Sequence, residues 1–215
     1  FRRVLFRSDL YHTFGKVQTN LLVEGFYTIL DDVFALRDMD DAADGGKVKE
    51  RYNGSGATVR GFNVEGRAAF TRWFELQAGV TLQQSRYREP EYWSEDAEVP
   101  PVRRMFRTPD AYGYFTASFK PVRNFTADLS GTCTGSMLVQ HIAGSGVGQD
   151  VAVSTPSFFD MNIRLSYDVR IYKEITMQLY GGVQNLFNAY QKDFDKGVDR
   201  DSGYIYGPSL PRSWF

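Results

Sequence analysis

Three stretches of the chain alternate between apolar and polar positions. From Phe125 to Met137 the odd positions are apolar or small and the even positions are polar, and the rhythm returns over Phe159–Val169 and Ile175–Val183. Successive side chains of a strand point to opposite faces, so this pattern predicts strands with one apolar and one polar face. Each stretch runs to about ten residues, which is the length that a tilted strand needs to cross a bilayer.

The predicted connections alternate between short turns and long loops. The short turns fall at 71–73, 120–124 and 170–173, and the long loops at Met39–Gly46, Arg88–Arg107, Gln140–Pro156 and Asn188–Ser202. Between them the sequence predicts strands at Val17–Asp38, Lys47–Phe70, Phe74–Tyr87, Pro109–Phe119, Phe125–Val139, Phe158–Val169, Glu174–Gln184 and Tyr204–Phe215. Short turns at one end and long loops at the other are typical of an up-and-down transmembrane β-barrel. The predicted fold is therefore all-β and antiparallel, an open barrel segment of about eight strands.

Aromatic residues gather beside each short turn. They are Phe70, Trp73 and Phe74 at the first, Phe119 and Phe125 at the second, and Tyr167 and Tyr172 at the third. This placement fits an aromatic girdle at a membrane interface, although an ordinary cross-strand cluster in a sandwich has the same composition.

Composition narrows the function classes. The net charge of −1 over 215 residues gives no field that favours nucleic acid. The mean hydropathy of −0.38 is low, as expected of a barrel with a polar lumen, and no run of about eighteen apolar residues predicts a membrane helix. Cys133 is the one cysteine, so no internal disulfide forms, and its place on the apolar face suggests a small packing residue.

Two motifs near the C-terminus carry a family resemblance. One is Asn185-Leu186-Phe187-Asn188, and the other combines Gly207-Pro208 with Pro211-Arg212. They resemble the C-terminal end of the TonB-dependent outer-membrane receptors of Gram-negative bacteria. The resemblance implies the last third of a barrel of about 22 strands, plugged by an N-terminal domain and embedded in outer-membrane lipid.

The resemblance also implies a function. Such a receptor performs energised uptake of a scarce, bulky nutrient such as an iron chelate, cobalamin or an oligosaccharide. It couples to TonB through the plug domain, which has no counterpart in this chain, and it performs no covalent chemistry and needs no cofactor.

The two ends of the sequence carry expectations of their own. Phe1–Ser8 can be encoded by DNA that looks like the end of a sequencing-library adaptor, so residues 1–8 are expected not to belong to the gene. Residues 9–215 are then the C-terminal portion of the barrel, with the reading frame extending upstream and past Phe215. A barrel segment with two unpaired edges is not expected to be stable alone in lipid.

The long loops hold the candidate binding residues. Asp193, Asp195, Asp199 and Asp201 surround a glycine as calcium ligands do, but Lys196 and Arg200 neutralise them, so a solvated turn is favoured. Exposed aromatic and basic residues suit ligand capture, and here the candidates are Tyr92, Trp93, Arg103, Arg104 and Phe106. The alternative is that these aromatics pack on a neighbouring loop. The two histidines, His12 and His141, and the single cysteine offer no metal-binding spacing and no catalytic arrangement.

Two other architectures remain open. One is a complete eight-stranded barrel with a structural or adhesive role, which would pair its first and last strands. The other is a soluble all-β binding module, in which Leu129, Ile163 and Leu179 would meet in a two-sheet core. The membrane-barrel interpretation instead places the odd residues of 125–183 outside and Asp128, Asp160 and Arg164 inside.

Overall fold

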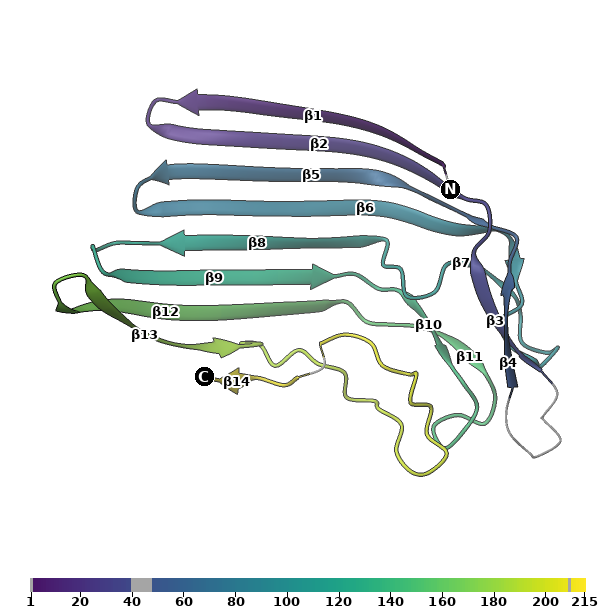
Figure 1. Cartoon of the computed structure of the whole chain (residues 1–215). Helices are drawn as coiled ribbons and strands as arrows, with labels where there is room; N and C mark the ends of the chain where they lie inside the picture. The colour runs from purple at the N-terminus through teal and green to yellow at the C-terminus, as the bar shows by residue number, and fades with distance from the viewer. Residues whose placement is uncertain (1, 40–47, 209) are drawn as a thin grey trace.

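The computed structural model describes residues 2–39, 48–208 and 210–215 (Figure 1). In this part of the chain all regular elements are strands, and none of the described residues belongs to a helix long and apolar enough to span a membrane. The strands are β1 (Arg2–Phe14), β2 (Val17–Leu30), β3 (Phe34–Met39), β4 (Val48–Asn53), β5 (Ala57–Thr71), β6 (Phe74–Glu91), β7 (Val102–Arg104), β8 (Ala111–Phe119), β9 (Phe125–Thr134), β10 (Leu138–His141), β11 (Val151–Ser154), β12 (Phe158–Tyr172), β13 (Ile175–Gln184) and β14 (Ser213–Trp214). The predicted loop at Met39–Gly46 lies almost wholly outside the described residues.

One long antiparallel sheet forms most of the molecule. Its strand order is β1-β2-β5-β6-β8-β9-β12-β13-β14, with β7 paired to the far end of β6. The small β3–β4 and β10–β11 hairpins stand at the end of the sheet that also carries the long loops, whereas the other end has the short turns (Figure 1). We call these the loop end and the turn end.

The sheet is open and single-layered. Its edge strands β1 and β14 lie at opposite ends of the strand order, and no described residue joins them. A complete eight-stranded barrel would pair these edges, and a sandwich would stack a second sheet on the apolar face. The structure therefore supports neither alternative and confirms an open sheet with barrel-type topology.

The strand register sorts the side chains into two faces. Leu129, Ile163 and Val183 lie opposite one another across β9, β12 and β13, and so do Asp128 and Arg164 in the next row. Residues directly opposite in an antiparallel pair share a face, so the predicted division of odd and even positions between the two faces is correct here. The apolar face is uncovered, since Leu165 is 45% exposed and Leu179 is 54% exposed.

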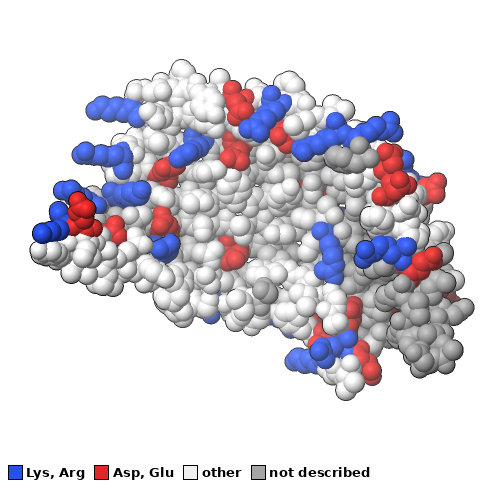
Figure 2. Space-filling view, viewed as in Figure 1, with Lys and Arg blue, Asp and Glu red and all other residues white. Residues whose placement is uncertain are grey.

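The other face is hollow and polar. A cavity of about 640 Å³ lies on it, lined in part by Asp128, Asp160 and Arg164. Side-chain hydrogen bonds run across neighbouring strands from Arg67 to Glu75 (2.6 Å), Gln77 to Glu65 (2.8 Å), Thr81 to Asn63 (3.1 Å), Ser118 to Asp128 (2.7 Å) and Gln178 to Asp168 (2.9 Å). On the face that Figure 2 shows, acidic and basic residues are intermixed, and no single sign of charge dominates there.

The structure differs from the predicted strands in several places. No strand is predicted before Val17, but β1 pairs with β2 along its whole length through a tight turn in which Gly15 has a φ of +62°. The predicted strands Val17–Asp38 and Lys47–Phe70 are each divided, because the chain bends after Leu30 and before Ala57 and turns into the β3–β4 hairpin.

The last predicted strand, Tyr204–Phe215, is also wrong. Its described residues, 204–208 and 210–215, are irregular except for the two residues of β14. Pro208 and Pro211 lack the N–H groups that a ladder requires, which explains why the alternation there does not become a strand.

Aromatic rings cluster at the turn end as predicted. The rings of Trp73 and Phe119 meet edge to face at 5.4 Å, and those of Phe70 and Phe74 lie 5.3 Å apart. The backbone joins the same turns, because the Lys120 N–H donates to the Trp73 carbonyl at 2.7 Å. That these rings form a membrane girdle stays a prediction.

Candidate functional site

The long segment after β13 folds back over the loop end of the sheet. Asn185 and Asn188 start this reversal in the left-handed region, with φ values of +50° and +56°. The Asn185 side chain donates to the carbonyls of Ala189 (3.2 Å) and Leu210 (2.9 Å) and accepts from the Ala189 N–H (2.8 Å). Asn185 thus closes a loop whose two ends it holds together.

The other motif residues support the same reversal. The Leu186 N–H donates to the Met161 carbonyl at 2.7 Å, and the Phe187 ring lies 5.8 Å from that of Phe159 on the apolar face. The Arg212 N–H donates to the Asn188 side chain at 2.9 Å. Gly207 has a φ of +73° and lies against the Phe158 ring, and Pro208 and Pro211 line the polar cavity.

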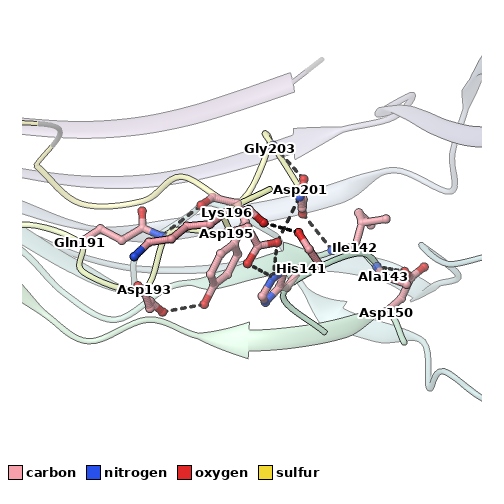
Figure 3. A network of polar contacts seen from close by, with 12 residues as sticks. His141, Ile142, Ala143, Asp150, Gln191, Asp193, Asp195, Lys196, Asp201 and Gly203 are labelled. Atoms are coloured by element: carbon pink, nitrogen blue, oxygen red, sulfur yellow. Dashed lines mark hydrogen bonds and ion pairs between the residues drawn. The ribbon is translucent and has the colours of Figure 1, made fainter. Parts of the chain in front are cut away.

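A buried polar network fastens the segment to the β10–β11 hairpin (Figure 3). Nε2 of His141 lies 3.0 Å from both carboxylate oxygens of Asp195, and both side chains are almost fully buried. The His141 ring stacks on Tyr204 with centroids 3.7 Å apart. Asp201 completes the contact, because it accepts from the Ile142 N–H at 2.9 Å while its own N–H donates to Asp195 at 3.1 Å.

A second part of the network lies deeper. Gln191 is 1% exposed, donates to the Tyr204 carbonyl (3.0 Å) and accepts from the Tyr206 N–H (2.7 Å). The hydroxyls of Tyr206 and Tyr204 donate to Asp193 at 2.6 and 3.1 Å. Both tyrosine rings pack on Val139 to form the small hydrophobic core of this end.

The electrostatics of the network stabilise its carboxylates in the ionised form. The hydrogen bond with His141 lowers the pKa of Asp195. Burial opposes ionisation of Asp193, but the hydrogen bonds from Tyr206 and Tyr204 outweigh it and its pKa is also lowered. Burial, and then the hydrogen bond to Asp193, raises the pKa of Tyr206.

The four candidate calcium ligands are not brought together. Asp193 faces the tyrosines, Asp195 faces His141 and Asp201 faces Ile142, while Asp199 accepts from the Ser145 N–H through its backbone carbonyl. Among the described residues no group of three or more metal-ligating side chains gathers. The structure shows the first three acting as hydrogen-bond acceptors for the protein, and calcium binding, the less favoured of the two sequence interpretations, stays untested.

The candidate ligand-capture residues are partly brought together. The rings of Trp93 and Phe106 meet at 5.3 Å, whereas Tyr92 is 72% exposed. The Arg103 guanidinium donates to the Arg88 carbonyl at 3.2 Å. Arg104 donates to the Ser136 carbonyl at 2.7 Å and pairs with Asp110 at 3.0 Å, so both arginines hold the loop in place.

Sequence reasoning missed the residues that fasten the loop end. From the sequence alone His141 belongs to no metal-binding or catalytic arrangement, Gln191 belongs to no motif, and Arg107 is only the end of a predicted loop. Arg107 donates to the carbonyls of Gly203 and Ile205, the latter at 2.8 Å, across 98 positions of sequence. No local pattern identifies such partners, because each contact joins segments that are distant in the chain.

The fold is that of a stretch of β-barrel wall, with one apolar face, one polar face and a folded loop end. Solved structures with this fold include the ferric-catecholate import receptor Fiu of Escherichia coli K12 (TM-score 0.59, 18% identity), the copper transporter OprC (0.56, 13%) and the outer membrane transporter YddB of Escherichia coli (0.56, 13%). Each match covers 99% of this chain but 27%, 30% and 31% of those chains, respectively.

These likenesses confirm the predicted barrel fold. The chain spans less than a third of the length of the structures that it matches. No protein-family profile matches the chain, and no curated protein matches it in sequence.

Proposed function

We propose that the chain forms part of the barrel wall and extracellular loops of a TonB-coupled uptake receptor in the outer membrane of a Gram-negative bacterium. The observation that carries the proposal is the single-layered sheet, whose apolar face is uncovered over eight long strands while its polar face is hollow. A sheet of this kind suits a wall with lipid on one side and a watery lumen on the other.

The similar structures support the proposal through the functions that their descriptions give. They include an import receptor for ferric catecholates, a copper transporter and an outer membrane transporter. The cargo proposed here is a scarce, bulky nutrient, either an iron chelate, cobalamin or an oligosaccharide. The loop end would face the cell exterior, and coupling to TonB would run through a plug domain.

An uptake assay in the native host tests the proposal. The gene that contains this chain is deleted, and growth is measured on limiting iron chelates, cobalamin and oligosaccharides in turn. We expect one class of nutrient to lose uptake, and we expect deletion of tonB to cause the same loss. Unchanged uptake of all three classes, or recovery of the protein from the soluble fraction, would contradict the proposal.

A further inference from the structure

A small cavity lies between the loops at the loop end, and we call it the ring pocket. Its volume is about 200 Å³. Four aromatic rings contribute to its walls, one of them a tyrosine, together with a serine hydroxyl, one amide and one carboxylate. The residues that the argument uses are Ser55, Tyr87, Glu91, Trp93, Phe106 and Gln140.

The walls of the ring pocket are held by contacts from several elements. Ser55 lies in the turn between β4 and β5, where the Gly54 N–H donates to the Val33 carbonyl at 2.8 Å. On the other side, Trp93 packs edge to face on Phe106. Glu91 accepts from the Tyr52 hydroxyl at 2.8 Å, which fixes the carboxylate beside the cavity. The pocket is therefore largely formed before any ligand arrives.

Two of the described residues that line the ring pocket carry a buried polar atom without a hydrogen-bond partner. These atoms are Nε1 of Trp93 and Oγ of Ser55, both of which are buried and have no partner among the described residues. Leaving such a buried group unsatisfied destabilises the fold. A small rotation of either side chain toward the cavity would offset part of that destabilisation if a ligand supplied the partner. A ligand that carries several hydroxyl groups could supply both missing hydrogen-bond partners.

The size of the cavity and the charge of its wall restrict the class of ligand further. The cavity is several times larger than the roughly 30 Å³ of one water but smaller than the 300 Å³ or more of a typical drug-sized site, so it suits a single ring. Glu91 is the one charged residue among the described residues that line it. An anionic ligand, such as a ferric tris-catecholate, would meet this carboxylate with no cation beside it.

We propose that the ring pocket binds one neutral sugar ring, as the terminal unit of an oligosaccharide. The aromatic walls offer faces on which the C–H groups of a sugar pack, and the carboxylate, amide, indole N–H and hydroxyl serve its hydroxyl groups. This inference rests on the proposed uptake function and names its cargo as an oligosaccharide.

Binding to the intact receptor in outer-membrane vesicles tests the inference. An array of neutral oligosaccharides identifies the best ligand, and titration calorimetry then measures its Kd for the receptor and its variants. Trp93→Ala removes a wall of the pocket and is expected to weaken binding at least tenfold. Trp93→Phe keeps a ring but loses the N–H, and is expected to weaken binding about 2- to 12-fold. Tyr92→Phe is the matched control, because Tyr92 is adjacent in sequence and exposed but does not line the cavity, and it should leave Kd unchanged.

Several results would overturn the inference. They are the absence of binding to every neutral oligosaccharide on the array, equal effects of Trp93→Phe and Tyr92→Phe, and displacement of the bound oligosaccharide by a ferric tris-catecholate. Cold-SDS mobility of each variant shows whether its barrel is folded, and a folded Trp93→Phe variant with unchanged Kd also counts against the inference. TonB-dependent uptake of a metal chelate without sugar binding would retain the proposed function while defeating the sugar assignment.

Discussion

Placing a charge on the apolar face tests whether that face meets lipid. Leu179 is the fifth residue of β13 and is 54% exposed. At about 3.3 Å per residue it lies about 13 Å along the strand, or about 10 Å along the membrane normal for a tilt of about 40°. The apolar band of such barrels is about 25 Å tall, so Leu179 sits near its middle, where a lysine costs about 2–4 kcal/mol. Leu179→Lys is therefore expected to lower the folded-to-unfolded ratio by about 30- to 1000-fold.

The neighbouring residue provides the matched control. Gln178 projects to the polar face and donates to Asp168 at 2.9 Å, so the lysine of Gln178→Lys would lie beside a carboxylate in water. We expect this variant to stay within about 1 kcal/mol of the wild type. Both variants are made in the intact receptor, and folding is followed in guanidinium chloride through the cold-SDS mobility of vesicle-inserted protein. A larger cost for Gln178→Lys than for Leu179→Lys would show that the two faces had been assigned the wrong way round.

Three further predictions concern the loop end, a turn and the sheet edges. Because the pKa of Asp195 is lowered in the folded state, its stabilising contribution is present above the unfolded pKa of about 4 and is lost as the pH falls through the folded value. Hydrogen exchange of residues 189–206, corrected for intrinsic rates, should therefore accelerate below about pH 4 in the wild type. Asp199→Asn should leave that pH profile unchanged. Gly56→Ala should lower the free energy of unfolding by more than about 1 kcal/mol, since φ at this position is +89° and the new Cβ would lie 2.5 Å from the Leu30 carbonyl oxygen. A Cβ added at Gly66 meets nothing within 4 Å, so Gly66→Ala serves as the control in the same denaturant titration. The chain expressed alone should fail to insert into vesicles, because the outer edges of β1 and β14 leave backbone groups unpaired at several kcal/mol each, and a heat-modifiable monomer band would contradict this.

Most of the long strands of the main sheet were predictable because the pattern that indicates them is local in sequence. Period-two alternation over Phe125–Val139, Phe158–Val169 and Glu174–Gln184 requires only neighbouring residues, and the strands and faces there agree with the prediction apart from shifted ends and the break after Thr134. The same rule failed at Tyr204–Phe215, where alternation is present but the prolines remove the ladder donors. Alternation therefore predicts a strand only where every residue can also supply its backbone N–H.

The structure of the loop end was not predictable from local sequence. Its order comes from pairs such as His141 with Asp195 and Arg107 with Ile205, which are 54 and 98 residues apart and carry no shared sequence signature. The aspartates that suggested a calcium turn illustrate the difficulty, because the same carboxylates satisfy buried donors once the chain has folded. A carboxylate-rich loop has two physical solutions, an added cation or internal N–H and O–H donors, and local spacing does not distinguish them. The distinction rests on whether distant donors such as the Ile142 N–H and the tyrosine hydroxyls reach the loop, and in this fold they do.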